Sequence, residues 1–203
     1  NSYILFAASM EPEGATLPIA LNGMYTEIGL RRILEALPDG WSIVFKENPD
    51  KFSQQFLFQS DWKSKYYYKN LQKTGRIIFV RDDIPTKNLI EGSIGVATIN
   101  GTIGLEALIA GKRCITFAPF WYDDFDGLHH VKSDNDISDA VKLMIDKVSP
   151  NPEPNQIKFS KHFLDMDGYN LSTYSKEDYK KICVGILEAY NDFLDIDDRK
   201  WEV

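Results

Sequence analysis

The chain has 203 residues, 43% of them hydrophobic, and its formal net charge is −7. That hydrophobic content is enough for a substantial core and excludes a disordered chain. A nucleic-acid-binding domain needs a concentrated basic surface, so the acidic balance excludes nucleic acid as a partner and favours a small ligand.

Strands and helices are expected to alternate along the chain. In chain order, the predicted elements are a strand at 3–8, a helix at 25–37, strands at 41–46 and 76–80, a short helix at 85–90, strands at 93–99 and 113–117 with a helix between them, and a helix at 137–148. The pattern does not assign a secondary structure to the aromatic and basic stretch at 52–68. Alternation of this kind predicts a doubly wound, Rossmann-like parallel α/β sheet, in which ligands bind at the carboxyl ends of the strands.

The end of the chain has a different pattern. A proline-rich linker is predicted at 149–155, and 176–193 has the apolar spacing of a long amphipathic helix. We therefore expect a Rossmann-like domain at 1–150, and a linker with a C-terminal helical appendage at 151–203 that packs back on it. The chain opens on Asn1 and enters a strand almost at once, which predicts a domain cut from a longer polypeptide.

The cysteines and the apolar runs bear on the compartment. Cys114 falls in a predicted strand and Cys183 in a predicted helix, a separation that fits no metal-binding pattern, so both are expected to be core thiols in a reducing compartment. No run approaches the roughly 18 apolar residues of a membrane span. These features predict a cytoplasmic protein.

The most informative segment follows the predicted strand at 93–99. Gly101 lets a ligand approach the backbone, Thr102 adds a hydroxyl donor, and the helix that begins there favours a phosphate or carboxylate. Glu106 lies one turn into this helix, where a carboxylate can accept hydrogen bonds from a ribose diol. The alternative is that Asn100 or Thr102 only caps the helix and that Glu106 is a solvated side chain.

Three loops at the carboxyl ends of strands carry polar residues, and together they resemble a known family. The segments are Glu11-Pro-Glu-Gly14, Lys46-Glu-Asn-Pro49 and Thr98-Ile-Asn-Gly-Thr-Ile-Gly-Leu-Glu-Ala-Leu108. They resemble the nucleotide-binding C-terminal half of GT-B glycosyltransferases of capsule and surface-polysaccharide synthesis, with the Kdo-transferase-like capsule proteins as the nearest group. The resemblance covers about the first two thirds of the chain.

The resemblance implies a glycosyltransferase donor-binding domain. It implies a nucleotide-sugar donor such as a CMP-linked acid sugar, a glycan or glycolipid acceptor, and no cofactor. The acceptor would be held by an N-terminal half that this chain lacks. The full-length protein would then work in the cytoplasm, with peripheral association at the inner face of the membrane left open.

The resemblance also assigns roles to residues of this chain. Lys46, Asn48 and Pro49 match a Lys-Glu-His-Pro motif that contacts the nucleotide, with Asn48 in place of the histidine. Asparagine can donate a hydrogen bond, but unlike histidine it cannot take up a proton and become positively charged.

Two further groups of residues match the family. The turn Asn100–Thr102 matches the one that receives the phosphate, and Glu106 matches the carboxylate near the ribose. Glu11 and Glu13 match the loop under the sugar, where they are either catalytic or part of a charged surface loop.

Residues 119–130 offer other candidates. Tyr122, within an aromatic cluster, is either a stacking surface for a base or sugar or part of the core, and His129 or His130 can hydrogen-bond to substrate. Asp124-Phe-Asp126 imitates a metal-binding Asp-x-Asp motif, but adjacent acidic residues in a glycine-containing loop are usually solvated, so no metal is expected.

Three functions remain open at this point. The first is the glycosyltransferase donor domain. The second is a sugar-nucleotide epimerase of the same fold, which requires the same phosphate turn and also acid and base residues around the sugar. The third is a non-catalytic half that binds a nucleotide or a partner domain.

Overall fold

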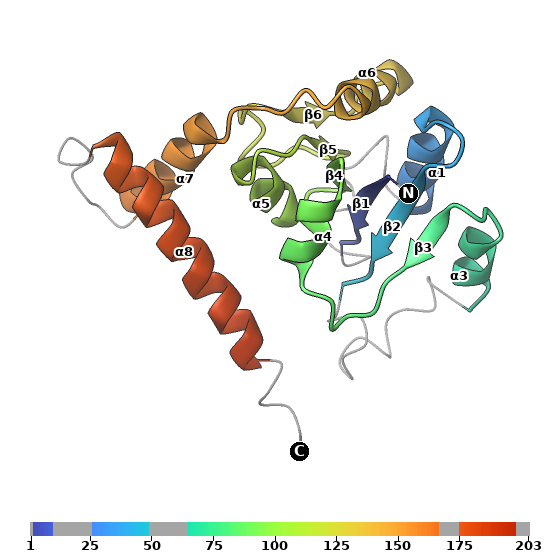
Figure 1. Ribbon diagram of the computed structural model, residues 1–203, viewed down its shortest axis with the longest axis horizontal. Coiled ribbons are helices and arrows are strands. Elements are labelled where there is room, and N and C mark those ends of the chain that lie inside the picture. The colour runs from blue at the N-terminus through green and yellow to red at the C-terminus, as the bar shows by residue number, and fades with distance from the viewer. Residues whose placement is uncertain (1, 10–25, 49–64, 167–174, 198–203) are drawn as a thin grey trace. The chain divides into compact units, whose positions relative to one another are not determined.

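A computed structural model of the protein describes residues 2–9, 26–48, 65–166 and 175–197. The chain divides into two compact units, Asn1–Pro150 and Asn151–Val203. The first contains an α/β sheet and the second a pair of helices (Figure 1).

The sheet of the first unit is entirely parallel. Its strands are β1 (Tyr3–Ala7), β2 (Ser42–Lys46), β3 (Ile77–Phe79), β4 (Gly95–Thr98), β5 (Cys114–Thr116) and β6 (Leu128–His130). Their order is β3-β2-β1-β4-β5-β6, and every neighbouring pair runs parallel. This is the Rossmann order, in which the winding reverses between β1 and β4, so the predicted fold class is confirmed.

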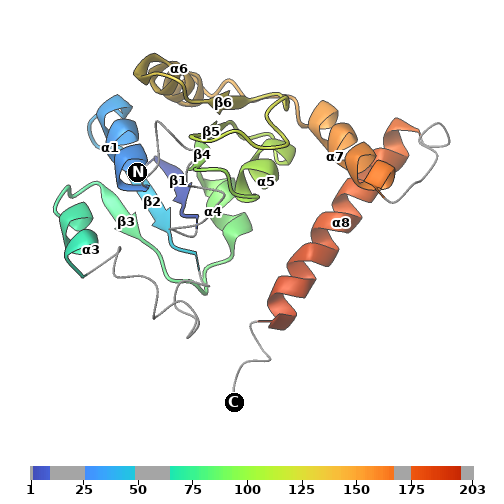
Figure 2. The same ribbon diagram turned by 180° about the vertical axis from the view of Figure 1, so that it is seen from behind.

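Helices cover both faces of this sheet (Figures 1 and 2). Those on the first face are α1 (Thr26–Ala36), α3 (Lys65–Gln72) and α6 (Asp134–Ile145), and those on the second are α4 (Thr86–Gly92) and α5 (Ile103–Ile109). Because successive side chains of a strand point to opposite faces, each strand contributes to the core on both sides of the sheet.

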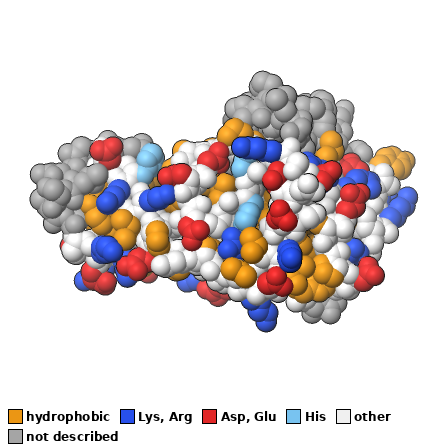
Figure 3. All heavy atoms as spheres, turned by 90° about the horizontal axis from the view of Figure 1, so that it is seen from above, with side chains coloured by type: hydrophobic (Ala, Val, Ile, Leu, Met, Phe, Trp, Pro, Cys, Tyr) orange, Lys and Arg blue, Asp and Glu red, His pale blue; other side chains and the backbone are white. Residues whose placement is uncertain are grey.

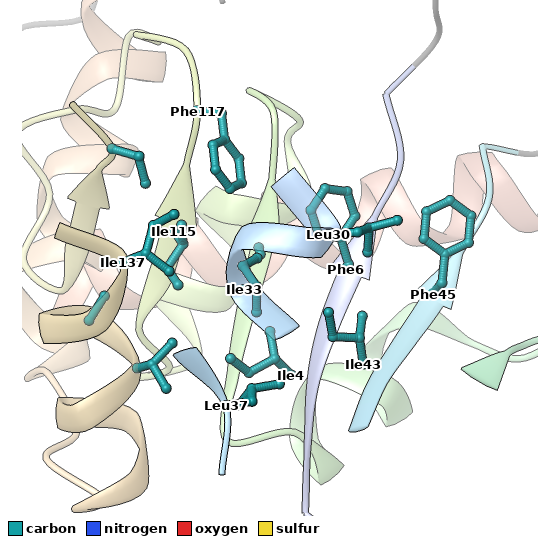
Figure 4. Close-up of a cluster of buried hydrophobic side chains, with 14 of the residues drawn as sticks. Ile4, Phe6, Leu30, Ile33, Leu37, Ile43, Phe45, Ile115, Phe117 and Ile137 are labelled. Atoms are coloured by element: carbon teal, nitrogen blue, oxygen red, sulfur yellow. The ribbon is translucent and has the colours of Figure 1, made fainter. Parts of the chain in front are cut away.

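The larger core lies under α1 and α6. Ile4 and Phe6 of β1 point into it, whereas Leu5 points toward α4 and α5. Figure 4 shows Ile33 and Leu30 of α1 over the side chains of the sheet. The rings of Phe6 and Phe45 stack with centroids 6.0 Å apart, which joins β1 to β2 inside the core.

Three elements, α3, β6 and α7 (Pro152–Met166), were not predicted from the sequence, and one helix starts early. β6 has three residues, too few for a periodic signal. Helix α7 begins inside the predicted linker, because proline is tolerated in the first turn, where the backbone N–H has no helical partner. Helix α6 begins at Asp134, where the Ser133 N–H donates to the Asp136 carboxylate at 2.6 Å and caps the helix.

The second unit pairs α7 with α8 (Lys176–Asp197). The buried Ser160 hydroxyl donates to the Tyr179 carbonyl at 2.6 Å, and Lys180 forms an ion pair with Glu153 at 3.2 Å. The expected packing of this unit on the first stays a prediction. None of the described helices is long and apolar enough to cross a membrane.

Candidate functional site

A row of mostly polar residues crosses the carboxyl edge of the sheet. The strand register aligns Lys46, Ala7, Thr98, Thr116 and His130 across β2, β1, β4, β5 and β6. Register partners in a parallel sheet point to the same face, which here is the α4 and α5 face. The row therefore passes the point between β1 and β4 where ligands bind in this fold.

The turn after β4 is held from two sides. Its Gly101 N–H donates to the Thr98 hydroxyl at 3.2 Å, and the Tyr122 hydroxyl donates to the Gly101 carbonyl at 2.5 Å. Both bracing side chains are buried, whereas Thr102 at the start of α5 is exposed. These bonds engage the N–H and the carbonyl of Gly101 and fix the turn, so it would need little reorganisation to bind a ligand.

Glu106 is a partly buried carboxylate. Burial raises its pKa to about 7. Its carboxylate has no hydrogen bond or ion pair with any residue that the structure describes. Since a buried charge is stable only when it is paired or hydrogen-bonded, the site favours a ligand that donates hydrogen bonds here, as a diol does.

Lys46 connects β2 to the loop before α4. Its ammonium donates to the carbonyls of Asp82 and Ile84, at 3.0 Å each. The side chain is nearly buried, so these contacts position the charge at the edge where the row of polar residues lies.

The residue after Lys46 anchors the loop that follows. The Glu47 carboxylate accepts hydrogen bonds from the Tyr68 hydroxyl at 2.6 Å and from the Asn48 N–H at 3.3 Å. Asn48 is therefore placed at the β2 end through its backbone. The other family-matched residues of these loops, Pro49, Glu11 and Glu13, lie outside the described residues.

Two predicted substrate contacts occupy other positions. Tyr122 is fully buried, so its ring packs within the protein and its hydroxyl braces the Gly101 turn. His129 aligns with Ile115 and so points to the α1 and α6 face, where its Nε2 lies 3.0 Å from the Arg113 guanidinium. Burial, followed by the Arg113 charge, lowers the His129 pKa, which disfavours the charged ring.

His130, rather than His129, lies in the row of the carboxyl edge. The His130 Nδ1 and the hydroxyl of the neighbouring Thr116 are both buried, and neither has a hydrogen-bond partner among the described residues. If the short β6 had been predicted, its parallel pairing with β5 would have placed His130 beside Thr116 on the same face of the sheet.

A matched pair of substitutions tests which threonine hydroxyl of the row stabilises the fold by a hydrogen bond. Thr98→Val should destabilise the fold by about 1–2 kcal/mol, because the Gly101 N–H loses its acceptor. Thr116→Val should be neutral or stabilising by up to about 1 kcal/mol, because it removes a buried hydroxyl without a partner. Urea unfolding of both variants measures the difference, and equal destabilisation would contradict the assignment.

The acidic loop gives no sign of a metal site. Asp123, Asp124 and Asp126 are exposed. Within the described part of the chain, no three His, Cys, Asp or Glu side chains gather closely enough to hold a metal ion.

The fold and this edge define a doubly wound, Rossmann-like domain with its candidate site at the switch point between β1 and β4. The family model for capsule polysaccharide biosynthesis proteins matches residues 24–147, more than half of the chain. The chain therefore belongs to this family. A search of the curated proteins found no match.

Two solved structures share the fold. UDP-GlcNAc 2-epimerase from Methanocaldococcus jannaschii matches with a TM-score of 0.54 at 16% identity, over 93% of this chain and 46% of the epimerase chain. The same enzyme in complex with UDP-GlcNAc and UDP matches with a TM-score of 0.50, again at 16% identity over 93% and 46%. The chain thus spans less than half the length of these proteins.

Proposed function

We propose that this chain is the donor-binding half of a glycosyltransferase that takes a nucleotide-sugar in capsule polysaccharide synthesis. The observation that carries the proposal is Glu106, a partly buried carboxylate with a raised pKa and no partner among the described residues, one turn after the braced Gly101 turn. A ribose and a phosphate of one nucleotide satisfy both features at once. The family match and the fold support this reading.

The chemistry proposed for the turn is stabilisation of a leaving group. Transfer of the sugar leaves negative charge on the nucleotide phosphate. The Gly101 N–H already donates to Thr98, so we assign the Thr102 hydroxyl and the positive end of the helix that follows to receive that charge, and the Lys46 charge lies at the same edge. Glu106 holds the ribose diol and orients the nucleotide.

Other parts of the proposal rest on the resemblance. Glu11 and Glu13 are proposed to act on the sugar, Asn48 and Pro49 to contact the nucleotide, and a preceding half to hold a glycan or glycolipid acceptor. Peripheral attachment to the membrane would occur through the full-length protein. The donor is proposed to be CMP-linked.

An epimerase is the second candidate, because the structures that share the fold are those of a UDP-GlcNAc 2-epimerase. Product analysis with the full-length protein separates the two. A transferase consumes an acceptor, whereas an epimerase converts the nucleotide-sugar without one.

Thr102→Val tests the turn itself. The substitution should weaken nucleotide binding by about 1–3 kcal/mol, because one hydrogen bond to a charged group is lost. Calorimetry with CMP, UDP and GDP ligands measures the effect and identifies the base. Ser138→Ala removes an exposed hydroxyl of α6 and serves as the control. Unchanged affinity in Thr102→Val, or no binding of any nucleotide to the unsubstituted protein, would overturn the proposal.

A further inference from the structure

A hollow of about 200 Å³ lies at the other end of the sheet. It is formed by the segments that precede β4 and β5, by the last turn of α6 and by the segment that follows α6. Because all strands are parallel, this is the amino edge, and the turn after β4 lies at the opposite, carboxyl edge. The hollow is therefore distinct from the proposed nucleotide site.

The lining of the hollow is basic in an acidic protein. It includes Lys112, Arg113 and Lys147, and none of the described residues that line it is acidic. The chain as a whole carries a formal net charge of −7, and Figure 3 shows acidic and basic side chains interspersed over one face of the molecule. Three cations around one concave surface attract an anion there.

Two of these cations are fixed by the backbone. Lys112 donates from its ammonium to the carbonyls of Glu91 at 2.9 Å and Ser93 at 2.7 Å. Arg113 donates from Nε to the Val148 carbonyl at 2.6 Å. An ammonium has three donors and a guanidinium has five, so both groups keep N–H donors beyond these bonds while their positions are set.

Lys147 contributes the third charge from an unusual backbone position. Its φ of 54° is the left-handed conformation that follows a helix, where glycine is the usual residue. Its N–H donates to the Met144 carbonyl at 3.1 Å. The ammonium has no hydrogen bond or ion pair with the residues that the structure describes. This leaves all three of its donors for a ligand.

The remaining wall is apolar. Ile94, Leu143 and Met144 line the hollow alongside the cations. An apolar wall lowers the local dielectric and strengthens the attraction between the cations and an anion.

From this arrangement, we propose that the hollow at the amino edge binds a phosphate group through Lys112, Arg113 and Lys147. A tetrahedral anion accepts several hydrogen bonds at once, and the guanidinium fork matches phosphate oxygens. The phosphate belongs either to a small soluble ester or to a lipid headgroup. This inference stands apart from the proposed nucleotide site, because the two lie at opposite edges of the sheet.

Inorganic phosphate is the first probe. Added at constant ionic strength, it should shift the backbone amide resonances of Gly111 and Ser149, which line the hollow. Lys147→Gln should weaken this binding about five- to tenfold, whereas Lys147→Arg should retain it. Lys142→Gln removes an exposed positive charge of α6 outside the lining and should leave the affinity unchanged. Absence of the shifts, or equal weakening in Lys147→Gln and Lys142→Gln, would overturn the proposal.

Vesicles identify the source of the phosphate. Phosphatidylcholine vesicles with and without phosphatidic acid are sedimented with the protein. Binding to the acidic vesicles that Lys147→Gln reduces and Lys142→Gln does not indicates a lipid headgroup. Phosphate-induced shifts without vesicle binding indicate a soluble ester. If calorimetry detected no binding of CMP, UDP or GDP ligands, neither of these results would change. The phosphate proposal and the nucleotide proposal can therefore be refuted separately.

Discussion

Glu106→Gln should stabilise the ligand-free protein at pH 8 by about 2–3 kcal/mol. The raised pKa of about 7, against an ordinary 4.5, means that ionising Glu106 costs more in the folded than in the unfolded protein. Glutamine has nearly the same shape and carries no charge, so the substitution removes this cost.

The pH dependence gives the sign of the effect. Below about pH 4.5 Glu106 is protonated in both states and costs nothing. Between about 4.5 and 7 the unfolded state releases its proton first, so the free energy of unfolding falls as the pH rises. Above about pH 7 the full cost is present. In Glu106→Gln this fall in the free energy of unfolding should be absent. The exposed control Glu35→Gln should show the same pH dependence of unfolding as the unsubstituted protein.

Binding should change in the opposite direction. Glu106→Gln should lose about 1–3 kcal/mol of nucleotide affinity, because the carboxylate is the stronger acceptor for a ribose diol. In the unsubstituted protein, affinity should rise as the pH passes about 7, where Glu106 becomes charged. Urea unfolding across pH and calorimetry at two pH values measure both effects. Stabilisation without loss of binding would remove Glu106 from the site.

Gly104→Ala should destabilise the protein by about 2–4 kcal/mol, as overpacking in a core does. A Cβ at this position would collide with the Tyr122 hydroxyl and come within 3.0 Å of the Cys114 sulfur. Helix α5 lies so close to Tyr122 and Cys114 at this position that only glycine fits. Displacing Tyr122 also breaks its hydrogen bond to Gly101, so nucleotide affinity should fall with stability.

A second substitution separates the collision from a general loss of packing. Tyr122→Phe removes the hydroxyl that a Cβ at Gly104 meets, so it should recover part of the stability lost in Gly104→Ala. Gly185→Ala in α8 meets no atom within 4 Å and should be stabilising by up to about 1 kcal/mol. Thermal unfolding of the four variants measures the coupling, and additive effects of the two substitutions would contradict this packing.

The candidate site was only partly predictable from the sequence. The glycine of the turn and the helical position of Glu106 are local features, and the structure places Glu106 in α5 directly after that turn. The burial that raises the Glu106 pKa depends on the elements packed around α5. The binding roles of these residues stay a prediction.

The aromatic loop illustrates what local patterns cannot decide. The sequence left Tyr122 either as a stacking surface or as core, and the structure buries it under α5. His129 and His130 are neighbours in the sequence, yet they point to opposite faces of β6. Only the register of β6 against β5 decides which histidine shares the row with Thr98.

The sequence by itself determined the doubly wound parallel sheet, because buried strands and amphipathic helices are encoded by apolar spacing within short windows. Tertiary structure alone decided the three-residue strand β6 and the convergence of Lys112, Arg113 and Lys147 on one hollow. These features depend on contacts between residues that are distant along the chain, and the spacing of residues within a short window does not determine those contacts.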